Sequence, residues 1–306
     1  MFEVRRVLCP VDFSEFSRRA LQHAARLAHW YGAHLHALHV DPAVPPPSVT
    51  PGPEASGAGI TASVALTAAL ATFVRPLQDT GIALEGHVAL GDVATRILDY
   101  TRSTRADLVV LGTHGQGGLE RLVLGSVAES VLRRSPCPVI TTRLADAPFL
   151  REGAPFRSIV CPVDFSPASL AALGHALSLA AEGDARLTLL HVLDCDVDRA
   201  PEAPAAADAQ GRLHAALPPR AGDWCRPRAV VAVGRVHEQV LRVADESSAD
   251  LIVLGLHGHP ALDVMRFGSN TVRIVRTAKC PVLTVSAGPI GAAHQPEREV
   301  ATIDAG

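Results

Sequence analysis

The chain consists of two copies of one sequence unit, and this internal repeat restricts its fold more than any other feature. VLCPVDFS at residues 7–14 returns as IVCPVDFS at 159–166, an offset of 152 residues. ADLVVLGTHG at 106–115 returns as ADLIVLGLHG at 249–258, and SPCPVITT at 135–142 returns as AKCPVLTV at 278–285, both at an offset of 143. We therefore predict two homologous domains, at residues 1–145 and 156–288, with a linker at 146–155 and a frayed tail at 289–306.

The two units differ in their middle, where the first carries nine more residues. The surplus lies in PAVPPPSVTPGPEASGAG, residues 42–59, and the matching segment is DCDVDRAPEAPAAADAQG, residues 194–211. Six prolines between residues 42 and 53 argue against a helix or a central strand there, because proline lacks an N–H and its ring clashes with the preceding turn. We expect an exposed loop in the first unit and an irregular segment in the second. A PxxP ligand for a proline-recognition domain is the functional alternative.

Apolar runs alternate with helical periodicity along each unit. In the first unit we expect strands within 4–12, 33–41, 83–91, 107–112 and 137–143, and helices within 14–32, 63–77 and 93–100 and after Gly125. Strands separated by helices pair in parallel through right-handed crossovers. Runs as apolar as LVVL are typical of strands covered on both faces. Each unit is therefore predicted to be a doubly wound α/β domain with a five-stranded parallel sheet.

Composition excludes several classes of function. The net charge is −3 and lysine and arginine form no cluster, which argues against binding nucleic acid or an anionic membrane surface. No stretch approaches the roughly 20 apolar residues of a membrane span, and the first apolar run is too short for a signal peptide. Six cysteines without a C-x-x-C pair indicate reduced thiols and a cytoplasmic location. Four of them adjoin a proline in apolar runs, where a small buried side chain is expected.

Ligands of open α/β sheets bind beyond the carboxyl ends of the strands, where the chain changes direction across the sheet. Three kinds of residue occupy such ends in both units. Aspartates follow the first strands, His-Val pairs end the second strands, and a G-x-x-G sequence ends the fourth. In chain order these are Asp12 and Asp164, His39-Val40 and His191-Val192, and Gly112-x-x-Gly115 and Gly255-x-x-Gly258.

The glycine sequence GTHGQGGLERLVLGS, residues 112–126, contains no lysine. Glycines allow close approach of the backbone to a ligand, and a helix that begins after Gly125 offers N–H groups and a positive dipole end to a phosphate. The alternative is that Ser126 caps the helix in a capping box with Glu129. The second unit keeps the Gly-Ser pair at 268–269 but has valine where the box needs glutamate, which favours a ligand.

Two further choices stay open on residue chemistry alone. Asp12 is equally suited to binding a ribose or to orienting the amides of a turn that leads into Ser14, a predicted N-cap. His114 and His257 are equally suited to touching a ligand or to bonding within their own loop. Ser166-Pro167 is the clearest helix start, with a cap followed by proline at the first helical position.

Together, V-D-F-S after the first strand, H-V after the second, G-x-x-G-x(9)-G-S and a closing C-P-V, each present twice, resemble the universal stress protein family in its tandem two-domain form. The resemblance implies strand order 3-2-1-4-5 and the binding of ATP, which Mg²⁺ can accompany. It implies no residue of the chain that ligates a metal. It implies pairing of 138–140 with 281–283 across a two-fold axis, so that the two domains form a pseudo-dimer. By position, the implied nucleotide-binding residues are Pro10, Val11, Asp12, Val40, Gly112, His114, Gly115, Gly125, Ser126, Val127, Pro162, Val163, Asp164, Val192, Gly255, His257, Gly258, Gly268, Ser269 and Asn270. Asn270 stands where the first unit has Val127, which changes the phosphate end of the second site.

The sequence leaves three functions to be distinguished. One is an ATP-binding stress or regulatory protein that acts through an unidentified protein partner or a further homodimer. Another is a slow ATPase, for which Arg121 and Arg266 are loose candidates and no catalytic residue is assigned. The third is an adaptor that binds no nucleotide. The absence of GK[ST] from the sequence excludes P-loop chemistry.

Overall fold

The computed structural model describes residues 3–42, 53–113, 124–143, 153–194, 203–259, 264–266 and 268–286. At 53–63, 79, 203, 257–259 and 264–266 it describes the backbone only. The first half contains β1 Arg6–Val11, α1 Glu15–Tyr31, β2 His34–Asp41, α2 Pro53–Val74, a 3₁₀ helix Arg75–Thr80, β3 Leu84–Leu90, α3 Val93–Thr104, β4 Leu108–Gly112, α4 Ser126–Arg134 and β5 Val139–Thr142. The second contains β6 Ser158–Pro162, α5 Pro167–Gly183, β7 Arg186–Leu193, α6 Ala203–Ala215, a 3₁₀ helix Ala221–Asp223, β8 Arg226–Val233, α7 Val236–Glu246, β9 Leu251–His259, β10 Val264–Arg266, α8 Ser269–Thr277 and β11 Val282–Ser286.

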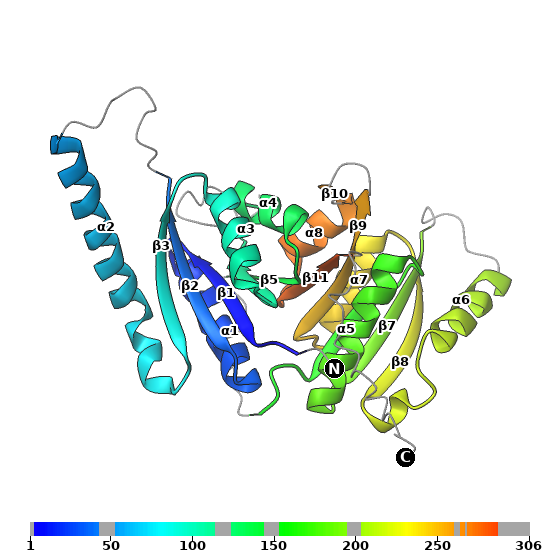
Figure 1. Ribbon diagram of the computed structural model, residues 1–306. Coiled ribbons are helices and arrows are strands. Elements are labelled where there is room, and N and C mark those ends of the chain that lie inside the picture. The colour runs from blue at the N-terminus through cyan, green and yellow to red at the C-terminus, as the bar shows by residue number, and fades with distance from the viewer. Residues whose placement is uncertain are drawn as a thin grey trace, which may run out of the picture.

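All the described strands except β10 form a single path through one sheet, in the order β3-β2-β1-β4-β5-β11-β9-β6-β7-β8. Each half therefore has the order 3-2-1-4-5, and its strands pair in parallel. The predicted fold class and strand order are confirmed. Figure 1 shows the two halves side by side, with β5 and β11 between them.

The junction of the halves is an antiparallel pairing of β5 with β11 that obeys a local two-fold symmetry. Ile140 lies opposite Leu283, its own counterpart at offset 143. The Thr141 hydroxyl donates to the Val282 carbonyl (3.3 Å), and the Thr284 hydroxyl returns the contact to Val139 (3.1 Å). This self-complementary contact is the geometry of a symmetric dimer interface formed within one chain, as the resemblance implied.

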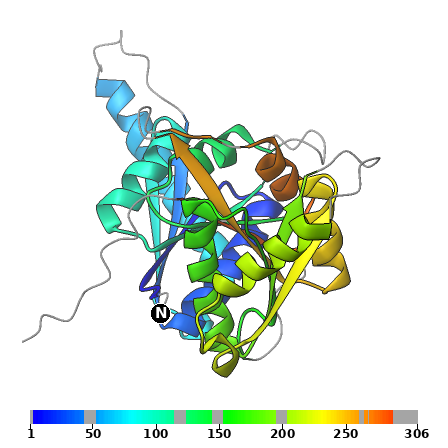
Figure 2. The same ribbon diagram turned by 90° about the vertical axis from the view of Figure 1, so that its right-hand side faces the viewer.

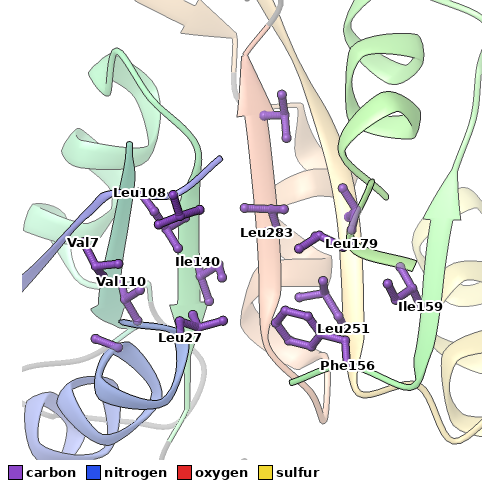
Figure 3. Close-up of a cluster of buried hydrophobic side chains, with 14 of the residues drawn as sticks. Val7, Leu27, Leu108, Val110, Ile140, Phe156, Ile159, Leu179, Leu251 and Leu283 are labelled. Atoms are coloured by element: carbon purple, nitrogen blue, oxygen red, sulfur yellow. The ribbon is translucent and has the colours of Figure 1, made fainter. Parts of the chain in front are cut away.

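Helices cover the sheet on both faces. Buried side chains of α1, α2, α5 and α6 form one apolar core, and those of α3, α4, α7 and α8 form another. Both cores continue across the junction. Figure 3 shows Ile140 and Leu283 facing each other between the side chains of the two halves. Figure 2 turns the second half toward the viewer.

The helices after the first strand of each half begin as their sequences predict, and α1 also ends where predicted. The Ser14 side chain accepts from the Ser17 amide, and Gly32, in the left-handed conformation with φ 61°, ends α1. The Ser166 side chain caps α5 in the same way, with Pro167 at the first position. None of the described helices is long and apolar enough to cross a membrane.

Three segments correct the sequence-based expectations. Helix α2 begins at Pro53, the last of the six prolines, because proline fits the first turn of a helix; the expectation of a loop through residue 59 was wrong. Residues 203–211, expected to be irregular, lie in α6. The glycine sequence of the second unit, expected to be a loop, contains the antiparallel pair β9–β10. The rest of the proline segment, 43–52, lies outside the described residues.

Candidate functional site

The carboxyl edge of each half brings together the chain segments singled out in the sequence. β1 lies between β2 and β4. Successive strands are therefore added on one side of β1 up to β3, and on its other side from β4 onward. The helix that follows β1 packs on one face of the sheet and the helix that follows β4 packs on the other. This is the switch point at which open α/β sheets bind ligands. In the second half β6, β7 and β9 take the same places.

The Asp-Phe-Ser turn after the first strand has one geometry in both halves. Oδ1 of Asp12 accepts from the Ser14 amide (3.1 Å) and from the Ser14 hydroxyl (2.6 Å). Asp164 holds Ser166 in the same way, at 3.0 and 2.6 Å. The turn-orienting role of these aspartates is therefore present in the structure. A ribose contact would have to be made in addition to it.

Between aspartate and serine stands a phenylalanine in the left-handed backbone region. φ is 63° at Phe13 and 64° at Phe165. This conformation costs a bulky residue about 1–3 kcal/mol and persists only where the surroundings impose it. The Phe13 ring stacks on His39 at 4.2 Å between centroids, and Phe165 lies 4.8 Å from His191. Because the same strained conformation occurs in both halves, we infer that the surrounding structure imposes this turn at both carboxyl edges.

The histidines that end the second strands connect two strand ends. His39 Nδ1 lies 2.9 Å from the carbonyl of Val11, and His191 Nδ1 lies 2.7 Å from the carbonyl of Val163. Since a carbonyl only accepts, Nδ1 carries the proton in both rings. Val40 and Val192, the predicted adenine contacts, follow directly and are thereby held beside the end of the first strand.

The helix after the glycine sequence starts at the carboxyl edge in both halves. Gly125 donates its amide to the Thr113 carbonyl (2.9 Å), so the start of α4 lies next to the end of β4. Gly125, which has no side chain, is the N-cap and Ser126 is the first helical residue, and no side chain of the described residues caps this helix. The capping-box alternative for Ser126 is wrong. Glu129 instead receives two hydrogen bonds from Arg133, at 3.0 and 2.7 Å. The second half repeats the arrangement with Gly268 as an uncapped N-cap.

Gly255 and Gly268 of the second motif have different physical roles. A Cβ on Gly255 would lie 2.4 Å from the backbone carbonyl of Ala168, so close packing of β9 under α5 requires glycine there. A Cβ on Gly268 would meet no atom of the described residues within 4 Å, and its φ is −61°. Among the described residues, neither packing nor backbone conformation explains this glycine.

Asn270, the departure in the second unit, belongs to a hydrogen-bonded group at the start of α8. Its Oδ1 lies 3.2 Å from His237 Nδ1, and Arg273 lies 3.2 Å from His237 Nε2. The first unit has Val127, Ala94 and Ser130 at these positions. The start of α8 is therefore more polar than the start of α4 and has a cation nearby.

The structure shows where most of the predicted site residues lie in the fold. Pro10, Val11, Pro162 and Val163 end or follow the first strands, and Gly112 ends β4. His114, Gly115 and Arg121 lie outside the described residues; His257 and Gly258 belong to β9, where only their backbone is described. Sequence reasoning missed Ser17 and Ser169, whose hydroxyls accept from the amides of Asp12 and Asp164 (3.3 Å each). The repeated D-F-S-x-x-S pattern was the available signal.

Comparison with known proteins agrees with this architecture. The sequence model described as the Universal stress protein family matches residues 3–143 and 155–286. The chain belongs to the universal stress protein family. Each half of the sheet is thus one universal stress protein domain, and the protein is a tandem member.

Relatives of this universal stress protein come from archaea and bacteria. A universal stress protein of Mycolicibacterium smegmatis is 29% identical over 212 residues, which covers 67% of this chain and 69% of the relative. Universal stress protein MJ0531 of Methanocaldococcus jannaschii is 31% identical over 145 residues, 45% of this chain and 82% of that one. A crystal structure from Archaeoglobus fulgidus superposes over 94% of this chain and all of its own, with TM-score 0.69 and 20% identity. That likeness concerns the fold.

Proposed function

We propose that this universal stress protein binds an adenine nucleotide, ATP in the first instance, at two sites, and that occupancy regulates its contacts with a partner in the cytoplasm. The observation that carries the proposal is the pair of uncapped helix starts at Gly125-Ser126 and Gly268-Ser269. Each presents N–H groups, a hydroxyl and the positive end of a helix dipole at the switch point of its sheet. These groups suit a phosphate chain that needs no lysine.

The remaining parts of each site suit a nucleoside. The strained Asp-Phe-Ser turn places a carboxylate at the end of the first strand, and the histidine of the second strand holds a valine backbone beside it. In this proposal the valine backbone meets the base, Asp12 and Asp164 meet the ribose, and the glycine sequences surround the phosphates. Mg²⁺ would accompany the phosphates rather than occupy a site made by the protein.

The first measurement is mass analysis of any small molecule released from freshly purified, denatured protein, followed by calorimetric titration with ATP and Mg²⁺. We expect two sites per chain. Replacing Ser126 or Ser269 by aspartate should abolish one site each, because a carboxylate at the first helical position repels phosphate while it stabilises the helix. Ser126→Thr and Ser269→Thr keep the hydroxyl and serve as controls.

The outcome separates the three functions. ATP binding that both Ser→Asp variants leave unchanged would contradict the assignment of the sites, and no nucleotide binding at all would favour the adaptor. Phosphate release should be followed in the same samples. Release that disappears in the double variant Ser126→Asp/Ser269→Asp would identify an ATPase; release that persists in the double variant comes from a contaminant.

A further inference from the structure

A second cluster of chemically active side chains lies away from the nucleotide edge, on the outer strands of the first half. His36 on β2 faces Glu85 on β3 across the strand pair, and His87 follows two residues later on the same face of β3. Their ligand atoms all lie within 4.8 Å of one another. His36 lies opposite Leu8, and Leu8 comes four residues before Asp12. At about 3.3 Å per residue, the cluster is therefore roughly 13 Å from the carboxyl edge.

The hydrogen-bonding capacity of this cluster is only partly used by the described residues. His87 Nε2 is buried and makes no hydrogen bond with any described residue, although Glu85 Oε2 is 3.3 Å away. His36 Nδ1 lies 3.9 Å from the same carboxylate oxygen. The hydroxyl of Tyr100 on α3 comes within 3.4 Å of His36 Nδ1 and closes the group on the helix side. A buried ring nitrogen without a partner is costly unless something else binds it.

We propose that His36, Glu85 and His87 form a binding site for one divalent transition-metal ion of the zinc class. Two imidazoles and one carboxylate are a ligand set that Zn²⁺ uses, with a fourth position for water. Tetrahedral bonds of about 2.1 Å place ligand atoms about 3.4 Å apart. The Glu85–His87 distance already has this value, and rotation of the rings and of the exposed Glu85 side chain brings His36 into range. Mg²⁺ and Ca²⁺ are excluded by their preference for oxygen ligands.

The charge of the cluster also suits a cation. The exposed carboxylate of Glu85 lies between the two histidine rings and supplies a negative charge that compensates part of the charge of the ion.

The second half of the chain is an internal control for this inference. It forms the same strand pair, β7 with β8, in the matching register, and there Thr188 lies opposite Arg228 and Leu190 opposite Val230. Val243 stands in the place of Tyr100. The fold itself therefore does not require two histidines, a glutamate and a tyrosine at this edge, and the second half has none of them.

The test is titration of the metal-free, full-length protein with Co²⁺, followed by visible absorption, and with Zn²⁺, followed by calorimetry. We expect one tightly bound ion per chain, with Co²⁺ absorption typical of four-coordination and displacement by Zn²⁺. Loss of outer-sphere partners alone weakens metal binding about 10–100-fold, so loss of a ligand in His87→Gln or His36→Gln should weaken it at least about 100-fold. His34→Gln, an exposed histidine on the same strand, is the matched control.

Thermal unfolding without metal establishes that each variant is folded. With saturating Zn²⁺ the wild type and His34→Gln should melt at a higher temperature, and the ligand variants should not. The proposal is overturned if the wild type binds no ion saturably at micromolar concentration. It is equally overturned if His36→Gln and His87→Gln retain the cobalt spectrum and the stoichiometry of the wild type. Neither result depends on whether the protein binds nucleotide.

Discussion

Gly255 offers the sharpest test of how the glycine motif should be understood. In the family resemblance it is a ligand-contacting residue, whereas in the structure it lies under the first turn of α5. An added Cβ would stand 2.4 Å from the carbonyl carbon and oxygen of Ala168 and 2.6 Å from the Ser169 amide nitrogen. We predict that Gly255→Ala destabilises the second half through this packing conflict.

The size of the effect follows from the distances. Non-bonded carbon contacts are comfortable at about 3.5–4.0 Å, so the strand or the helix has to move by roughly 1 Å. Overpacking of this kind costs about 1–3 kcal/mol, occasionally more. The upper end applies here because the obstacle is backbone, held in place by the Ser166 cap and by the Ser169 hydroxyl that accepts from Asp164. We expect a loss of about 3 kcal/mol in the free energy of unfolding.

Gly268→Ala is the matched control within the same motif. Its Cβ would meet no atom of the described residues within 4 Å, so the change should cost below about 1 kcal/mol, the difference between glycine and alanine at an N-cap. Unfolding in guanidinium chloride, followed by far-ultraviolet circular dichroism, measures both variants. Equal stability of Gly255→Ala and wild type would refute the packing argument, and so would an equal loss in the two variants. In nucleotide titrations the ranking should reverse, with Gly268→Ala folded but weakened in binding.

Three further predictions concern stability. Burial, reinforced by Arg19 and Arg26, lowers the pKa of His23 to about 4, so its neutral form contributes about 3 kcal/mol above pH 6.5 that is lost as the pH falls toward 4; His23→Gln should flatten acid unfolding in this interval. Tyr31→Phe removes the 2.6 Å hydrogen bond to Glu182 between α1 and α5 and should lower the free energy of unfolding by about 1.5–3 kcal/mol. Leu283→Ala removes a fully buried side chain at the junction of the halves and should cost about 2–5 kcal/mol.

Each of these has a control and a contradicting result. His29→Gln, an exposed histidine on the same helix, should leave the acid transition unchanged, and a His23 variant that unfolds in acid like the wild type would contradict the linkage. For Tyr31 the reasoning fails if denaturant midpoints of variant and wild type coincide. Val64→Ala, an exposed position on α2, is the control for Leu283, and equal costs at the two sites would show that burial at the junction is not the cause.

Much of the architecture could be predicted because the same sequence unit occurs twice in the chain. Repeated apolar runs predict alternating strands and helices. Capping residues such as Ser14 and Gly32 set the ends of a helix through contacts with residues only a few positions away. The same logic failed at α2, where the proline count predicted a loop but the last proline serves as the first residue of a helix. Such a choice depends on what the helix packs against, and Leu70 and Phe73 of α2 are buried against the core.

The sequence alone determined the two-domain repeat, the parallel α/β class and the strand ends at which a ligand should bind, because these follow from local periodicity and from duplication. Only the tertiary structure decided the individual roles. It showed that Ser126 is not the N-cap, that packing requires Gly255 but not Gly268 among the described residues, and that Phe13 adopts a left-handed backbone conformation with its ring stacked on His39. It also brought His36, Glu85 and His87 together, from positions about 50 residues apart. Contacts across strands depend on register and on helix placement, which no pattern within one segment encodes.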